Sequence, residues 1–401
     1  MDTVCGLDIS RDTQAATILG GSLKVRRSFG VSDEELSNLK SWLRENNCSR
    51  IVMESTGIYW VPIYSALEEA GFQIILANPR QVKAIPGRKT DQSDSEWLAY
   101  LLRAELVKPS YIPERRLRVL RSLTRLRTQL TQNQSDYKNR AHKILQLCNI
   151  RLASKLTDIF GKSGRIILDA LMNGRSLDEA LTRCPKRIQA KGEAVKATIM
   201  GTLDQTDLLQ LKVCLEMIDT IQEKMHKLDG EIAKLVDEQV VRRISTVPGV
   251  KETSAASVIA EIGDPTRFPG EKQVGAYAGL VPSVRQSAKR RWYGGITKHG
   301  SRWLRRTLTQ CALAAIKVRD SKLRMYYLKI RSRRGHNIAI VALARKLLII
   351  IHHLLLTGEE YVERTVRRKR LRMIRPSDLK VPFEDALTLL ARAGFMISNY
   401  G

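Results

Sequence analysis

The stretch Val4-Cys5-Gly6-Leu7-Asp8-Ile9-Ser10 decides how the first hundred residues of this chain fold. Its apolar and β-branched residues predict a short strand, in which Val4, Gly6 and Asp8 share one face. The Asp8 side chain would then project from the sheet surface next to Gly6, which has no side chain. A carboxylate in a core strand is costly unless it is paired or binds a metal ion, so Asp8 is the first candidate site residue.

Strand and helix signals alternate from this strand to residue 77. We expect two more strands, a capped helix, a strand, a helix and a strand, at residues 14–19, 23–31, 32–46, 50–54, 57–70 and 72–77. Three strands followed by two helix–strand repeats indicate a mixed sheet covered by helices, which is an α/β fold.

Composition limits the class of partner. The 401 residues include 68 Lys and Arg against 41 Asp and Glu, a formal net charge of +27. The length predicts two or three domains, and a hydrophobic share of 43% excludes a disordered basic tail protein. The natural partner of a protein with this excess of positive charge is a polyanion. Nucleic acid is the first candidate, and an anionic membrane surface is the other.

Other classes of protein are disfavoured. The six cysteines lie far apart without a CxxC pair, which disfavours a zinc ribbon and is typical of reduced cytosolic thiols. No secretory leader is recognisable, so we expect a cytoplasmic protein. The most apolar stretch, 338–356, is interrupted by Arg345, Lys346 and two histidines, so we expect no membrane span.

The middle of the chain turns helical near residue 117. Leucines recur at positions 117, 120, 123, 126 and 130, flanked by arginines, and apolar residues between 208 and 235 recur about every 3.4 residues. This spacing is typical of a coiled-coil-like seam, and the alternative is an amphipathic helix on a local core. The stretch 151–205 between them predicts irregular helices.

The segment Ile244-Ser-Thr-Val-Pro-Gly-Val250 precedes an Ala-rich helix expected at 254–262. It resembles a helix-hairpin-helix, in which a Pro-Gly turn presents backbone N–H groups to a phosphate. A packing corner without a ligand is the alternative interpretation.

Four carboxylates form the first candidate centre. Asp8 lies in the first strand, Glu54 ends the strand at 50–54, and Asp91 and Asp94 are spaced i, i+3 at the start of a helix expected over 91–106. Together they predict an oxygen-rich pocket for Mg²⁺ or Mn²⁺, in which two metal ions would serve in-line phosphodiester chemistry. Taken singly, Asp91 could cap its helix, Asp94 could complement the helix dipole, and Glu54 could pair with a surface arginine.

The stretch 281–306 carries positive charge and no acid. Its basic residues are Arg285, Lys289, Arg290, Arg291, Lys298, Arg302, Arg305 and Arg306, and we expect the first seven of these to bind nucleic acid. Two further basic clusters lie at 317–334 and 364–375.

Ser287 lies inside this basic stretch and forms the second candidate centre. A serine among arginines could attack a DNA phosphate and form a phosphoserine, with Arg285 and Arg291 as candidate clamps on the transition state. The alternative is a surface-loop serine. Ser283, Thr297 and Ser301 are equally reactive in principle, and spacing cannot choose among them.

Two blocks of motifs resemble the DEDD insertion-sequence transposases of the IS-one-ten family, whose invertase relative is Piv. The first block is Gly6-Leu7-Asp8-Ile9-Ser10, Met53-Glu54-Ser55-Thr56-Gly57, Asn78-Pro79 and Lys89-Thr90-Asp91-Gln92-Ser93-Asp94. The second is Val247-Pro248-Gly249-Val250, Ala276-Tyr277-Ala278-Gly279-Leu280-Val281-Pro282, Gln286-Ser287 and Gly295-Ile296-Thr297-Lys298-His299-Gly300-Ser301-Arg302-Trp303-Leu304-Arg305. The resemblance spans residues 1–360.

The resemblance implies a RuvC-like (RNase H-like) domain that carries four acids, here Asp8, Glu54, Asp91 and Asp94. It also implies a carboxy-terminal serine that attacks DNA, here Ser287, although Ala288 stands where the family usually has glycine. Family members are dimers and tetramers joined by a coiled coil, with the acids of one subunit facing the serine of another. They pair donor and target DNA with a non-coding bridge RNA, and they are bacterial and nucleoid-associated.

We therefore expect an α/β RuvC-like domain at 1–112, a helical linker with a coiled coil at 113–240, a mostly α transposase domain with a helix-hairpin-helix-like segment at 241–360, and a basic tail at 361–401. The expected function is a Mg²⁺-dependent transposase and recombinase. The alternatives are a RuvC-like hydrolytic nuclease of the junction-resolvase type and a non-catalytic RNA- or DNA-binding scaffold. The tail matches no motif of the family, and we expect it to be an added nucleic-acid-binding arm.

Overall fold

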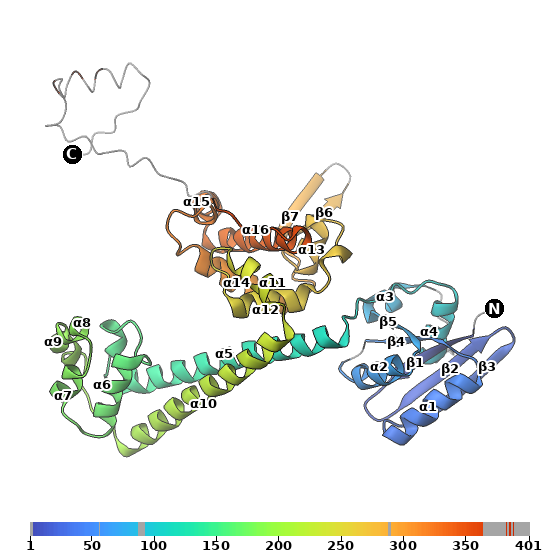
Figure 1. Cartoon of the computed structure of the whole chain (residues 1–401), viewed down its shortest axis with the longest axis horizontal. Coiled ribbons are helices and arrows are strands. Elements are labelled where there is room, and N and C mark those ends of the chain that lie inside the picture. The colour runs from blue at the N-terminus through green and yellow to red at the C-terminus, as the bar shows by residue number, and fades with distance from the viewer. Residues whose placement is uncertain are drawn as a thin grey trace. The chain divides into compact units, whose positions relative to one another are not determined.

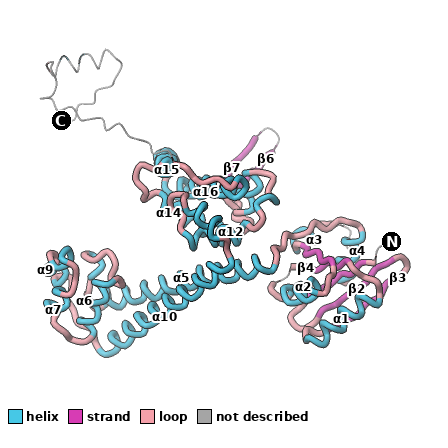
Figure 2. Tube along the Cα trace, viewed as in Figure 1, coloured by secondary structure: helices cyan, strands magenta, loops and turns pink. Residues whose placement is uncertain are grey.

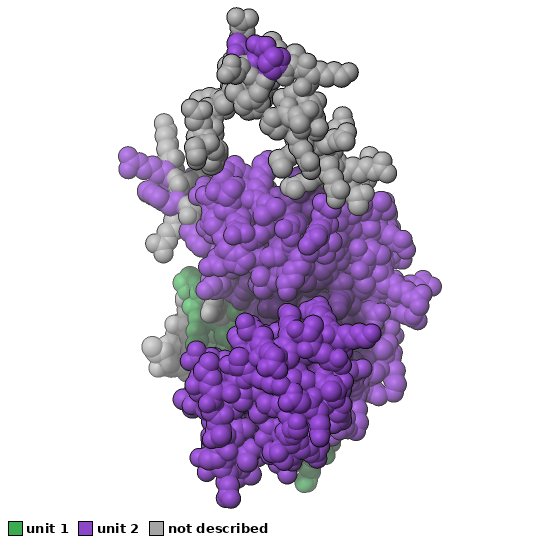
Figure 3. All heavy atoms as spheres, turned by 90° about the vertical axis from the view of Figure 1, so that its left-hand side faces the viewer, with its two compact units in different colours: residues 1–114 green, residues 115–401 purple. Residues whose placement is uncertain are grey.

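The computed structural model describes residues 3–55, 57–86, 93–287 and 290–363, together with residues 382, 385 and 388. The chain divides into two compact units, Met1–Glu114 and Arg115–Gly401 (Figure 3). Each unit has its own hydrophobic core, so each is described by itself.

A five-stranded mixed sheet forms the centre of the first unit (Figure 1). Its strands are β1 (Val4–Ile9), β2 (Gln14–Gly20), β3 (Leu23–Phe29), β4 (Arg50–Glu54) and β5 (Gln73–Ala77), in the order β3-β2-β1-β4-β5. β2 is antiparallel to both of its neighbours, whereas β1, β4 and β5 run parallel. The structure confirms the mixed α/β sheet predicted from the alternation of strand and helix signals.

Helices cover both faces of this sheet. On one face, α1 (Asp33–Glu45) and α2 (Trp60–Glu69) bury apolar side chains against residues such as Leu7. On the other face, α3 (Pro79–Ala84) and α4 (Asp94–Arg103) pack on a second cluster that includes Val4 and Val52 of β1 and β4. Because side chains alternate along a strand, Gly6 and Asp8 lie on the face that α4 covers.

Gly6 lets α4 approach the sheet closely. A Cβ atom on Gly6 would lie 2.1 Å from the Ser95 carbonyl oxygen and 2.5 Å from the Ala99 backbone nitrogen. Thr17 lies opposite Gly6 in β2, and its hydroxyl is 2.8 Å from the buried Ser95 hydroxyl in a hydrogen bond. The missing side chain and this hydrogen bond together fix the first turn of α4 on the sheet.

A methyl group at position 6 should therefore destabilise the first unit. We expect Gly6→Ala to lower the free energy of unfolding in urea by about 3 kcal/mol, at the high end for overpacking, because backbone rather than a flexible side chain must move. Gly230→Ala is the control, since no atom lies within 4 Å of a Cβ there and the helix should gain stability. Equal stability of Gly6→Ala and the unchanged protein would contradict the close contact.

Two long helices, α5 (Arg115–Leu147) and α10 (Gln205–Leu235), pack side by side in the second unit (Figure 2). The apolar stripe of α10 is buried at its centre, against α5 of the same chain. In α5 the predicted leucine stripe is only partly right, because Leu126 is 44% exposed. The side chains of α5 that are buried include the polar residues Thr124 and Gln134, and Gln134 donates to the Ile218 carbonyl and the Gln222 side chain.

This packing places the seam inside one chain. A coiled coil that joins two protomers is a separate matter and stays a prediction.

Short helices cap the far end of this helix pair. They are α6 (Lys162–Met172), α7 (Leu177–Thr182), α8 (Lys186–Gln189) and α9 (Gly192–Lys196), preceded by the 3-10 turn Leu152–Ser154. A bridge between Ile150 and Ile199 closes the base of this segment. We refer to residues 151–203 as the helical cap; the structure confirms the irregular helices predicted there.

The rest of the second unit is a mostly helical body with one β-hairpin. Its elements are α11 (Glu238–Ser245), α12 (Glu252–Ile262), the 3-10 turn Pro265–Arg267, α13 (Glu271–Tyr277), β6 (Pro282–Ser287), β7 (Arg290–Ile296), α14 (Arg302–Ala315), α15 (Lys322–Arg334) and α16 (His336–Thr357). The helices enclose one core, and the hairpin projects from it (Figure 1).

The Pro-Gly turn between α11 and α12 is a tight packing point. Gly249 has a φ of +87°, and a Cβ there would lie 2.5 Å from both the Ala315 nitrogen and the Cys311 carbonyl oxygen of α14. These contacts fit the packing-corner interpretation of this segment. Phosphate binding by a helix-hairpin-helix stays a prediction.

One helix, α16, is long and apolar enough to cross a membrane by length and composition alone, contrary to the expectation from its charges. Half of its most apolar window is buried inside the protein, where residues such as Leu343 and Leu347 pack in the core of the helical body. α16 is therefore accounted for as a core helix.

Candidate functional site

Two of the candidate acids, Asp8 and Glu54, lie near the carboxyl ends of β1 and β4. The parallel register pairs Gly6 with Val52 and Leu7 with Met53, so Asp8 and Glu54 come next on neighbouring strands. Both belong to the face that α4 covers, and α4 begins at Asp94 on the same side. Asp8 and Glu54 are half-buried, and Asp94 is exposed. We call Asp8, Glu54 and Asp94 the acid edge.

The predicted helix start at Asp91 is wrong. Ser93 is the N-cap of α4, with extended backbone (φ −67°, ψ 154°), and its hydroxyl accepts the Glu96 N–H. An i, i+3 pair on one helical face needs helical backbone at every residue between, so that argument for pairing Asp91 with Asp94 fails. Asp91 itself lies outside the described residues.

The acid edge fits a hard cation by its donor set. All three side chains are carboxylates, and oxygen donors are the ligands that Mg²⁺ and Mn²⁺ prefer. Among the described residues no group of three His, Cys, Asp or Glu side chains is close enough to hold a metal ion. Metal binding by Asp8, Glu54, Asp91 and Asp94 stays a prediction.

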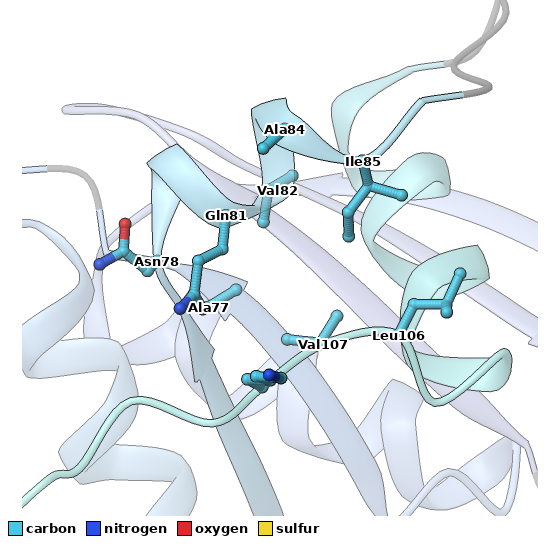
Figure 4. A pocket seen from close by; sticks show the side chains of 9 residues that line it. Ala77, Asn78, Gln81, Val82, Ala84, Ile85, Leu106 and Val107 are labelled. Atoms are coloured by element: carbon cyan, nitrogen blue, oxygen red, sulfur yellow. The ribbon is translucent and has the colours of Figure 1, made fainter. Parts of the chain in front are cut away.

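A mostly apolar pocket lies next to the acid edge. It encloses about 260 Å³ between α3 and the segment that follows α4, with Val82 and Ile85 on one side and Leu106 and Val107 on the other (Figure 4). Its floor includes Ala77, the register partner of Glu54. The sequence did not reveal this pocket, because its walls come from three segments and no motif marks them.

Ser287 ends β6 near the tip of the β6–β7 hairpin and is exposed. The register pairs Ser287 with Arg290 and Arg285 with Trp292, so these four positions belong to one face of the hairpin. Gln286 and its partner Arg291 belong to the other face. Of the two candidate clamps, position 285 therefore shares a face with Ser287, and position 291 does not.

One of the competing hydroxyls already has structural partners. Ser301 caps α14 by accepting the Leu304 N–H, and it donates to a Glu261 carboxylate oxygen at 2.8 Å. The structure thus gives Ser301 a structural role, whereas Ser287 lies near the tip of the hairpin and is exposed.

The basic residues around Ser287 differ in their surroundings. Arg290, Lys298 and Arg302 are exposed, whereas Arg305 donates to the carbonyl oxygens of Ala278 and Lys298. Arg285 and Arg291 lie in β6 and β7, and Lys289 lies outside the described residues. Arg305 therefore braces the loop before α14. Nucleic-acid binding by this whole set stays a prediction.

Glu261 is the residue of this region that sequence reasoning missed. It is 1% exposed, at the end of α12, and its carboxylate accepts two hydrogen bonds from Arg125 at 2.7 and 3.0 Å as well as the Ser301 hydroxyl. Its carbonyl oxygen accepts the Tyr277 hydroxyl at 3.0 Å. One buried acid thus links α5 to both motif segments of the helical body. The signal that could have found it is a glutamate between apolar residues near the end of an Ala-rich helix.

Neutralising Glu261 should destabilise the second unit. We expect Glu261→Gln to lower the free energy of unfolding by about 3 kcal/mol, the low end for breaking a buried pair, because the Arg125 side chain is 38% exposed. Glu238→Gln removes an exposed partner of Arg242 and should cost less than about 1 kcal/mol. Equal costs in the two variants, measured by urea unfolding, would refute the importance of the buried pair.

Two family models match this chain. A model of DEDD transposases of IS110, described as a transposase, matches residues 5–150. A second model, described as the transposase IS116/IS110/IS902 family, matches residues 241–328. Together they cover more than half of the chain, in the order of the two motif blocks.

Curated relatives and solved structures were also found. The chain is 27% identical over 319 residues to a probable family 20 transposase of Pseudomonas aeruginosa, covering 77% of this chain and 85% of the relative. It is 37% identical over 123 residues to the transposase for insertion sequence element IS1111A of Coxiella burnetii, covering 30% of this chain and 34% of the relative. The T. thermophilus RuvC in complex with Holliday junction substrate is 14% identical, with a TM-score of 0.21, over 27% of this chain and 100% of that one.

Proposed function

Because this chain belongs to the IS110 family of DEDD transposases, the IS-one-ten family of the motif blocks, we propose that it excises and inserts an insertion-sequence element. The observation that carries the proposal is the register of β1 and β4, which brings Asp8 and Glu54 to one edge and one face of the sheet. Its substrates would be donor and target DNA, and the acid edge would act on their phosphodiester bonds.

The acids would hold a divalent cation. Asp8 and Glu54 supply carboxylate oxygens from two rigid strands, with Asp94 at the first turn of α4 and Asp91 as the fourth acid of the family pattern. A bound Mg²⁺ or Mn²⁺ would polarise the scissile phosphate. Both carboxylates come from strands of the same sheet, which limits the reorganisation that metal binding would need.

Ser287 would be the nucleophile. Its hydroxyl oxygen would bond to the phosphorus while the bond from phosphorus to one deoxyribose oxygen breaks, and the serine proton would end on the released DNA hydroxyl. This exchange conserves the number of phosphodiester bonds, so the DNA can later be rejoined. Support comes from the exposure of Ser287 at the hairpin tip and from Arg285 and Arg290 on the same face.

The assembly would follow the family pattern. We propose a dimer or tetramer in which the acids of one protomer act with the serine of another, guided by a non-coding bridge RNA. The proposed domains are 1–112, 113–240, 241–360 and a tail at 361–401. The acids and Ser287 lie in different compact units of the chain, as such a division of labour between protomers requires.

Neutralising the acid edge should stop strand cleavage. We expect Asp8→Asn and Glu54→Gln each to reduce cleavage of element-end DNA in Mg²⁺ by at least about 100-fold, since electrostatic stabilisation of this kind contributes about 10² to 10³ in rate. Removal of Mg²⁺ with EDTA should have the same effect, and added Mn²⁺ should restore activity. The control is Glu45→Gln at the far end of α1, which should cleave normally. Full activity of Asp8→Asn in Mg²⁺ would refute the metal site.

Removing the Ser287 hydroxyl should abolish a covalent protein–DNA adduct. We expect Ser287→Ala to leave DNA binding within about 3-fold, because one neutral hydroxyl adds little to phosphate contact, while the adduct trapped by denaturation disappears. Ser283→Ala is the matched control and should still form the adduct. Persistence of the adduct in Ser287→Ala would rule out this serine. Cleavage without any adduct in the unchanged protein would instead indicate a hydrolytic nuclease.

A further inference from the structure

The helical cap, residues 151–203, lies between the two segments that match the family models and carries an uneven distribution of charge. Its ten basic residues outnumber five acids. Four of the five acids are engaged inside the cap: Asp169 pairs with Arg175, Asp178 and Glu193 pair with Lys196, and Asp158 accepts the Phe160 N–H. The positive charge that remains is therefore not cancelled locally.

Seven basic residues of the cap are exposed and make no ion pair within the described part of the chain. They are Arg151, Lys155, Lys162, Arg183, Lys186, Arg187 and Lys191. Four of these lie within nine residues, from Arg183 to Lys191, and no acid occurs between positions 180 and 192. We call Arg183, Lys186, Arg187 and Lys191 the basic ridge.

The backbone under the basic ridge is held in place. The Gln189 side chain donates to the carbonyl oxygens of Thr182 at 2.9 Å and Cys184 at 2.8 Å, which ties α8 to the preceding turn. Cys184 and Leu181 are buried in the core of the cap. The four charges are thus presented from a fixed scaffold, which reduces the entropy lost when they bind a partner.

The cap lacks the side chains that read single strands. Proteins that bind single-stranded nucleic acid stack bases on exposed aromatic rings. The only aromatic residue in the cap is Phe160, which is half-buried against His142 of α5. Lysine and arginine without aromatic rings are typical of contact with the phosphates of a duplex, which needs no access to the bases.

We propose that the basic ridge binds the sugar-phosphate backbone of a nucleic-acid duplex, as a contact surface separate from the acid edge and from the β6–β7 hairpin. The phosphates could belong to duplex DNA or to a folded, base-paired RNA, since both present the same chemistry. The inference rests on the proposed function in taking nucleic acid as the partner. Its role is to hold a long duplex at the end of the α5–α10 helix pair.

The test compares two variants of the full chain that lose the same charge. The ridge variant is Arg183→Gln, Lys186→Gln, Arg187→Gln and Lys191→Gln. The control variant is Arg175→Gln, Lys196→Gln, Lys227→Gln and Lys234→Gln, in which every replaced residue is paired with an acid. Binding of a 30-base-pair DNA duplex and of a 30-base-pair RNA duplex is measured by fluorescence anisotropy between 50 and 300 mM NaCl.

We expect the ridge variant to lose about 10- to 100-fold in affinity for at least one duplex and to reduce the magnitude of the slope of log K against log salt by up to about 3.6, since each of four phosphate contacts contributes about 0.9. The control variant should stay within about 3-fold. The duplex that shows the loss identifies the source of the phosphates. Equal effects in both variants, or no effect of the ridge variant on either duplex, would overturn the proposal.

The same experiment separates this inference from the proposed function. Asp8→Asn should bind both duplexes normally but fail to cleave. If Asp8→Asn cleaves while the ridge variant loses binding, the assignment of the catalytic acids is wrong and the proposal for the basic ridge is supported. If the ridge variant binds and cleaves normally, the proposal for the basic ridge is wrong and the assignment of the catalytic acids is unaffected.

Discussion

The contact between Gly6 and the backbone of α4 is the constraint on which the first unit depends. With no Cβ at this position, the Ser95 carbonyl and the Ala99 amide reach the surface of the sheet, and Ser95 bonds to Thr17. The first turn of α4 therefore lies against Gly6 of β1. The position of Asp94 follows from this packing, and those of Asp8 and Glu54 follow from the parallel register of β1 and β4.

Glu261 plays a comparable part in the second unit. Two motif segments, around Tyr277 and Ser301, come together because their hydroxyls reach the same residue, and Arg125 neutralises its buried charge. The β6–β7 hairpin, which carries Ser287, lies in the chain between these two segments. A substitution at Glu261 therefore alters the packing of the segments that flank the hairpin, although Glu261 is not part of it. A stability defect and a catalytic defect can therefore have a common origin here.

Much of the first unit could be predicted from the sequence, because strands and helices there have strong local signals. Alternating apolar runs gave the strands of the sheet, and Ser32 caps α1 as expected. The predicted helix start at Asp91 is wrong because Ser93 is the N-cap of α4, with a side chain that accepts the Glu96 N–H. The choice between two neighbouring caps depends on how α4 meets the sheet, which is not a local property.

The second unit was harder to predict, because its decisive contacts join residues far apart in the chain. Buried Gln134 and Thr124 in α5 carry no apolar signal, and the leucine stripe pointed to partly exposed positions. The basic residues around Ser287 made it a candidate, but its position at the end of a strand was not predicted. The pairing of Glu261 with Arg125 spans 136 residues and could not be read from spacing.

Divalent-cation binding at the acid edge can be measured with Mn²⁺ by electron paramagnetic resonance. We expect Mn²⁺ to bind the unchanged protein and Mg²⁺ to compete for the same site. In the double variant Asp8→Asn and Glu54→Gln, Mn²⁺ affinity should fall at least about 10-fold, since ligand charge sets the affinity of such sites. Unchanged Mn²⁺ binding in that variant would contradict the account.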